Sequence, residues 1–169
     1  MQKVSHPQVK RRYTLIFLAT ALIITADQLT KIWIRSYPEG STIFEIGFLR
    51  LIRTHNTGVA FGLFQGQSFA ITIVVSVGIV VLLLYAFFAY HRFPFLDNMP
   101  NRIALGLILG GTVGNMIDRL NSSLNGITDF ISISIWPSFN IADSAITVGA
   151  ILFAYSLIRS VQTEPHQDG

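Results

Sequence analysis

Residues 69–90, FAITIVVSVGIVVLLLYAFFAY, run for 22 residues without a formal charge. A helix needs about 20 apolar residues to cross the ~30 Å hydrocarbon core of a bilayer. Further apolar segments of similar length occur at residues 13–34, 101–120 and 139–158. The pattern predicts an all-α membrane protein with four transmembrane helices, organised as one integral membrane domain over residues 1–169.

The composition agrees with a membrane environment and excludes several kinds of site. Hydrophobic residues make up 51% of the 169 residues and charged residues only 12%, with a mean hydropathy of +0.53. Soluble chains carry about 25% charged residues, so a soluble enzyme is not expected. The absence of cysteine excludes disulfides, iron–sulfur clusters and a cysteine nucleophile. The net charge of +3 does not indicate nucleic acid, because the basic residues lie in short groups around the apolar segments.

The basic residues also predict the orientation in the membrane. Seven Lys and Arg flank the predicted helices on the side of the termini and five on the other side, with residues 10–12 (KRR) directly before the first helix. Charges beside the first helix usually dominate, so both termini are expected in the cytoplasm. An alternative is a signal peptide cleaved after residues 19–21 (ATA). Because hydrophobicity continues through Ile23 and Ile24, a retained helix is favoured.

The connections on the outer side have features of a small sheet. The first, about residues 36–68, is long for an unstructured loop and contains the strand-forming runs Thr42–Phe44 and Phe48–Ile52. The second ends in another such run, Ile131–Trp136, which follows Asp129 in the loop. These runs predict a small periplasmic β-sheet, or cradle, at the membrane surface.

Glycines repeat on one face of the predicted helix at residues 101–120. Gly106, Gly110 and Gly114 are each four residues apart. Small residues at this spacing let helix backbones approach closely in lipid, so this face is predicted to pack against another helix.

Polar and ionisable residues gather at the outer boundary of the predicted helices. An ionisable group in a membrane span is costly and marks a candidate functional site. The residues that gather there are Asp27, Lys31, Asn56, Asn115, Asp118, Arg119, Asp129, Asn140 and Asp143.

A structural role can explain several of these residues. Asp27 and Lys31 are four residues apart and could simply neutralise each other at a helix end. Asn140 could cap the fourth helix, and Asp143 could complement its positive end. Arg119 could reach another carboxylate or a lipid phosphate.

Asp129 and Asp143 also suit acid–base chemistry. Two carboxylates that share a site do not both ionise easily, so one keeps a proton while the other acts as a base. The base can activate water for attack on a carbonyl, and the acid can protonate the departing group. Other hydrolytic chemistries lack their sequence signatures, since the chain has no HExxH or GxSxG motif. No metal or cofactor is therefore expected.

Five stretches occur in an order that resembles the signature blocks of the lipoprotein signal peptidases (signal peptidase II). They are DQLTK at 27–31, NTGVAFG at 56–62, GNMIDR at 114–119, GITDFI at 126–131 and FNIADS at 139–144. Together they extend from the first predicted helix to the fourth.

This resemblance implies an aspartyl endopeptidase of the bacterial inner membrane, with its active site on the periplasmic side. The enzyme would cut prolipoproteins just before the diacylglyceryl-modified cysteine. It implies that Asp129 and Asp143 are catalytic. It also implies substrate-binding or supporting roles for Asn56, Gly58, Asn115, Arg119, Asn140, Asp27, Lys31 and Asp118. Expected partners are lipid-modified prolipoprotein, membrane phospholipid and globomycin-type cyclic peptide inhibitors. On the outer side, Arg50, Arg53 and Arg119 are expected to contact lipid phosphates.

Two other functions are compatible with some of these features. A proton-coupled transporter also uses carboxylates in membrane spans, but its acids would be distributed across the membrane depth. A non-enzymatic assembly factor could use the glycine face to bind a partner helix, but it would leave Asp129 and Asp143 without a role.

Overall fold

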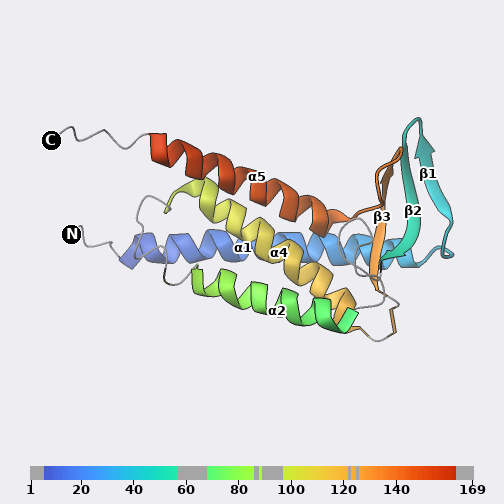
Figure 1. Cartoon of the computed structure of the whole chain (residues 1–169), viewed down its shortest axis with the longest axis horizontal. Coiled ribbons are helices and arrows are strands. Elements are labelled where there is room, and N and C mark those ends of the chain that lie inside the picture. The colour runs from blue at the N-terminus through green and yellow to red at the C-terminus, as the bar shows by residue number, and fades with distance from the viewer. Residues whose placement is uncertain are drawn as a thin grey trace.

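The structure, a computed structural model, describes residues 6–56, 68–85, 88, 97–121, 123–124 and 126–162. Its elements are α1 (His6–Arg35), β1 (Thr42–Ile46), β2 (Leu49–Asn56), α2 (Ser68–Leu84), α4 (Met99–Leu120), β3 (Ile127–Ile133) and α5 (Ile141–Gln162). The helices form a bundle, and the strands form a small sheet at one end of it (Figure 1). The start of α1 and the end of α5 both lie at the opposite end of the bundle.

Three of the described helices are long and apolar enough to cross a membrane. These segments are Tyr13–Arg35, Met99–Leu120 and Ile141–Ser160. In α2 the apolar segment Ile73–Leu84 is shorter, and the rest of the predicted span at 69–90 lies partly outside the described residues. Four transmembrane helices therefore remain a prediction.

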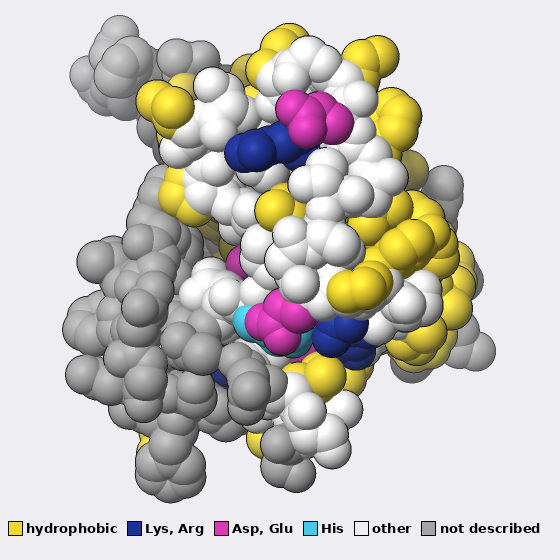
Figure 2. Space-filling model, turned by 90° about the vertical axis from the view of Figure 1, so that its right-hand side faces the viewer, with side chains coloured by type: hydrophobic (Ala, Val, Ile, Leu, Met, Phe, Trp, Pro, Cys, Tyr) yellow, Lys and Arg dark blue, Asp and Glu magenta, His cyan; other side chains and the backbone are white. Residues whose placement is uncertain are grey.

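The distribution of side chains is the reverse of that in a water-soluble protein. Large apolar side chains point outward, and those of Phe17 and Val74 are 69% and 70% exposed. The charged side chains of Asp27, Lys31 and Asp118 are completely buried. A hydrocarbon environment explains this arrangement, because lipid solvates apolar surface and leaves charges to find partners inside the protein. The sheet end, by contrast, exposes acidic and basic side chains next to hydrophobic ones (Figure 2).

Glycines allow the central helix α4 to pack closely against its neighbours. A Cβ atom at Gly106 would lie 2.5 Å from the Cβ of Ala19, and one at Gly110 would lie 2.8 Å from the Cβ of Ile23. Both contacts are with α1, which confirms the predicted packing face. Gly149 of α5 gives a similar close approach to α4.

The sheet is antiparallel, with strand order β1-β2-β3. The first two strands overlap the predicted runs but extend beyond them, to Ile46 and to Asn56. The third prediction, Ile131–Trp136, was wrong in its bounds, because the strand begins at Ile127 and ends at Ile133. Ser134 adopts a left-handed conformation (φ 49°), and the amide of Trp136 donates to the carbonyl of Ile133, so the chain turns there. Asp129 consequently lies on a strand and not in a loop.

Arg53 of β2 connects the sheet to the carboxyl end of α1. Its Nη1 atom donates to the backbone carbonyls of Arg35 and Tyr37. The carbonyl of Arg35 belongs to the last turn of α1, where carbonyls lack partners within the helix, and a cation favours the negative end of a helix dipole. The guanidinium expected to contact lipid phosphate is therefore engaged with the end of α1.

The close approach of α1 and α4 gives a test of the packing. We expect Gly110→Ala to destabilise the protein by about 1–3 kcal/mol, because the added methyl group would force the helices apart. The measurement is unfolding of the purified protein in detergent. Gly78→Ala in α2 is the matched control, since a Cβ at Gly78 would meet no atom within 4 Å. Equal stability of the two variants would contradict the packing role.

Candidate active site

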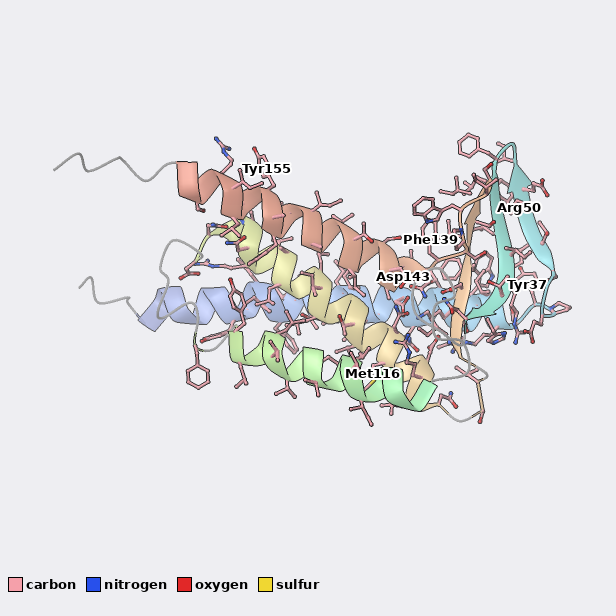
Figure 3. All side chains as sticks on the ribbon, in the orientation of Figure 1. Tyr37, Arg50, Met116, Phe139, Asp143 and Tyr155 are labelled. Atoms are coloured by element: carbon pink, nitrogen blue, oxygen red, sulfur yellow. The ribbon has the colours of Figure 1, made fainter. Side chains whose placement is uncertain are left out.

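A cavity of about 610 Å³ lies where the helices meet the sheet. Its polar lining consists mainly of Asn56, Asn115, Arg119, Asp129 and Asp143, and apolar side chains such as Val75, Ile127, Trp136, Ile146 and Val148 line the remainder. Asp143 lies at the end of α5 that faces the sheet, close to Phe139 (Figure 3). The cavity thus combines two carboxylates and one guanidinium with a largely apolar wall.

Asn140 connects the two carboxylates. Its Nδ2 atom donates to Oδ1 of Asp129 over 2.8 Å. It is also the N-terminal cap of α5, where its Oδ1 accepts from the backbone amide of Asp143 over 2.9 Å. In return, the backbone amide of Asn140 donates to Oδ2 of Asp143 over 3.2 Å. This reciprocal arrangement is a capping box, which fixes the start of the helix and the orientation of Asp143 together.

Asn115 of α4 connects Asp143 to the interior of the bundle. Its Nδ2 atom donates to Oδ1 of Asp143 over 2.8 Å. Its Oδ1 atom accepts from Nζ of Lys31 over 2.9 Å and from Nδ2 of Asn140 over 3.1 Å. Because Lys31 can only donate, it binds the oxygen of the Asn115 amide, and the amide nitrogen is left to face the carboxylate of Asp143.

Lys31 of α1 has three partners, which matches the three donors of an ammonium group. Besides Asn115, its Nζ atom lies 2.8 Å from Oδ2 of Asp27 and 3.4 Å from Oδ2 of Asp118. All three charged side chains are completely buried. The predicted neutralisation of Asp27 by Lys31 is confirmed, and Asp118 joins the same group.

Asp27 also holds the first turn of α5. Its Oδ1 atom accepts from the backbone amide of Ala142 over 3.0 Å, so a residue of α1 satisfies an amide that has no partner within α5. Gly114 makes room for this contact, because a Cβ there would lie 2.7 Å from Oδ2 of Asp27.

Asp118 joins α4 to the sheet. Its Oδ2 atom accepts from the backbone amide of Thr128 over 3.0 Å, and its Oδ1 atom lies 2.7 Å from Nη2 of Arg35. Arg35 donates in addition from Nε to Oγ1 of Thr128 over 2.8 Å. Thr128 immediately precedes Asp129, so these contacts hold the strand that carries the second cavity carboxylate.

The charges of the interior balance, but those of the cavity do not. Lys31 and Arg35 form direct ion pairs with Asp27 and Asp118, whereas Lys31 acts on Asp129 and Asp143 only through its charge at longer range. Burial and the nearby Asp143 raise the pKa of Asp129 to about 7, although hydrogen bonds from Asn56 and Asn140 oppose the rise. Asp129 can therefore hold a proton near neutral pH, as an acid catalyst must.

The structure brings together nearly all the residues that the sequence singled out. Asn56, Asn115, Arg119, Asp129 and Asp143 line the cavity, Lys31 and Asn140 contact lining residues, and Asp27 and Asp118 contact Lys31 behind the lining. Gly58 lies outside the described residues.

Three participants were not predicted from the sequence, namely Gln28, Arg35 and Thr128. Gln28 donates from Nε2 to the carbonyl of Gly114 over 3.0 Å, and Arg35 and Thr128 make the contacts given above. A signal for Arg35 was available, because it follows Lys31 by four residues and so shares its helix face.

Within the described residues, no group of three His, Asp or Glu side chains is arranged to hold a metal ion. The two carboxylates of the lining can support proton transfer, with Arg119 as a cation in the same cavity.

Comparison with known proteins places the chain in a family. A family model described as "Signal peptidase (SPase) II" matches residues 19–159. The chain belongs to the signal peptidase II family. The matched segment includes every residue of the cavity and of the buried charged cluster.

Similar proteins extend this result. The chain is 48% identical over 141 residues to the lipoprotein signal peptidase of Dehalococcoides mccartyi strain BAV1, covering 83% of this chain and 86% of the relative. It is 39% identical over 145 residues to that of Moorella thermoacetica, covering 84% and 92%. Among solved structures, a bacterial membrane enzyme determined by the in meso method at 2.3 Å has a TM-score of 0.78 at 26% identity. That match covers 91% of this chain and 93% of the other.

Two conclusions follow from membership of the signal peptidase II family. The chain has lipoprotein signal peptidase function, which makes it a peptidase. Its apolar helices, together with its membrane-enzyme neighbours, make it a multi-pass membrane protein.

The buried cluster of this signal peptidase II gives a second test. We expect Lys31→Met to cost about 3–5 kcal/mol of stability, because it leaves Asp27 and Asp118 buried without their shared cation. Glu39→Gln is the control, since this carboxylate is 65% exposed and its hydrogen bond with His55 should contribute less than about 1 kcal/mol. Unfolding in detergent measures both variants. A loss for Lys31→Met no larger than for Glu39→Gln would contradict the central role of the lysine.

Proposed function

We propose that the chain is an aspartyl endopeptidase that removes the signal peptide from bacterial prolipoproteins by cutting before the diacylglyceryl-modified cysteine. The observation that carries the proposal is that Asp129 and Asp143 line one cavity and are held by the same residue, Asn140. Their buried surroundings and mutual repulsion favour a pair that shares one proton.

The proposed reaction uses this shared proton. The ionised carboxylate takes a proton from water, whose oxygen attacks the scissile carbonyl carbon. The protonated carboxyl then supplies a proton to the departing amide nitrogen as the C–N bond breaks. Asn115 and Asn140 donate to the carboxylates and so hold both in position. Arg119 offers a cation in the same cavity, suited to a lipid phosphate or to developing negative charge.

The position of the cavity suits a lipidated substrate. A diacylglyceryl group anchored in the outer leaflet would hold the adjacent peptide bond near the headgroups. In our proposal all four helices cross the inner membrane, both termini are cytoplasmic, and the sheet lies on the periplasmic side as a cradle for the substrate. The apolar cavity wall would receive the signal peptide or acyl chains, and globomycin-type cyclic peptides would compete for it.

Carboxamide variants test the proposed pair. We expect Asp129→Asn and Asp143→Asn each to lower cleavage of a diacylglyceryl-modified prolipoprotein by at least about 10²–10⁴-fold, because each removes a proton donor or acceptor. The assay uses purified protein in detergent and substrate of verified lipidation.

Asp97→Asn is the matched control for this experiment. Asp97 is a largely buried carboxylate that forms an ion pair with Arg102 near the start of α4, far from the cavity. It should leave cleavage near the wild-type rate. Robust cleavage by either folded cavity variant would refute the pair.

The pH dependence provides a separate test. The pKa of Asp129 is raised to about 7 in the substrate-free protein, so the protonated pair persists to neutral pH and kcat/KM, measured at substrate concentrations well below KM, should fall as the pH rises above about 7. The pKa of Asp129 is higher in the folded protein than in the unfolded chain. Its contribution to the free energy of unfolding is therefore fully present below about pH 4 and is lost as the pH rises to about 7. A decline of the cleavage rate above pH 7 is therefore not explained by a further loss of folding stability caused by ionisation of Asp129. A rate that stays constant to pH 9 would contradict a proton held in this range.

A further inference from the structure

Arg35, at the carboxyl end of α1, is the point at which the sheet is attached to the bundle. Its side chain contacts Asp118 of α4 and Thr128 of β3, through Nη2 at 2.7 Å and Nε at 2.8 Å. Its backbone carbonyl accepts from Nη1 of Arg53 in β2 over 2.7 Å. Two strands of the sheet are thus attached to this one residue.

Thr128 is held from three directions. Its hydroxyl accepts from Arg35, its backbone amide donates to Asp118 over 3.0 Å, and its carbonyl accepts from Nδ2 of Asn140 over 3.4 Å. Thr128 is also completely buried. The peptide unit that leads into Asp129 therefore has little freedom to move relative to α4 and α5.

The geometry of a strand transfers this restraint to Asp129. Successive side chains of a strand point to opposite faces, so when Thr128 is fixed against α1 and α4 its neighbour is directed to the other face. Asp129 lines the cavity on that other face. Moving the Thr128 anchor would move the carboxylate of Asp129 relative to Asp143, which is held separately by the start of α5.

We propose that Arg35 is a positioning residue for the peptidase reaction, acting through Thr128 to set the place of Asp129 relative to Asp143. This proposal rests on the proposed function, because it requires Asp129 to be catalytic. Arg35 lines no part of the cavity and is not a catalytic residue itself.

The test separates an effect on the chemical step from an effect on substrate binding. Arg35→Met should lower kcat by about 10–100-fold, since a displacement near 1 Å can cost about 10²-fold, while KM changes by less than about 3-fold. Thr128→Val keeps the shape and the backbone amide but removes the hydroxyl, and it should lower kcat in the same way. The double variant should be no slower than the slower single variant, because each substitution removes the same contact, between Nε of Arg35 and Oγ1 of Thr128.

Arg102→Met is the matched control. Arg102 forms an ion pair with Asp97 at 2.9 Å, and its side chain is 16% exposed compared with 17% for Arg35. It lies 16 residues before Asp118 on α4, about 24 Å along the helix. This variant should lose stability but keep the wild-type kcat.

Three outcomes would overturn the proposal. They are a wild-type kcat in Arg35→Met and Thr128→Val, additive losses in the double variant, or an equal fall of kcat in Arg102→Met. Asp129→Asn, assayed in parallel, distinguishes the two levels of inference. If it is inactive while Arg35→Met has a wild-type kcat, only the positioning role fails. If Asp129→Asn remains active, the proposed function fails, and the positioning role with it.

Discussion

The buried ammonium of Lys31 is the interaction on which the rest of the structure depends. An isolated charge in a protein interior surrounded by hydrocarbon is strongly unfavourable, so the chain must bring oxygen atoms to it from several elements. Asp27 comes from its own helix, and Asp118 and Asn115 come from α4. Each of these partners also contacts a further element: Asp27 and Asn115 contact α5, and Asp118 contacts β3. The location of one cation thereby determines how α1, α4, α5 and β3 meet.

This arrangement separates the polar groups into two sets with different properties. The inner set pairs its charges with one another, and its members Asp27, Lys31 and Asp118 are completely buried. The outer set, Asp129 and Asp143, receives hydrogen bonds mainly from neutral amides and lies at an open cavity. Asn115 and Asn140 lie between the two sets. Their neutral amides orient the outer carboxylates through hydrogen bonds, and Asn115 also contacts Lys31 of the inner set. In the proposed mechanism, proton transfer is therefore confined to the outer carboxylates.

Much of this could be predicted from local sequence, and the remainder depended on contacts between distant segments. The apolar segments, the glycine face of α4, the pairing of Asp27 with Lys31 and the capping role of Asn140 all follow from short-range spacing. The strand position of Asp129 does not, because β3 forms by pairing with β2, and Thr54 contacts Asp129 across 75 residues of sequence. Arg35 follows Lys31 by four residues on α1, but its partners come from α4 and β3. Residue spacing alone does not reveal which elements become neighbours.

The chain order of these elements has a consequence for biosynthesis. The sheet joins β2, which precedes α2, to β3, which follows α4, and Asn140 and Asp143 arrive only with α5. A ribosome releases these parts in sequence, so the nascent protein holds only one of the two cavity carboxylates until its last helix emerges. Formation of the sheet is thereby delayed until α4 and β3 have been made, and assembly of the carboxylate pair is delayed until α5 has been made. Maturation of the enzyme is in this way coupled to completion of its own insertion.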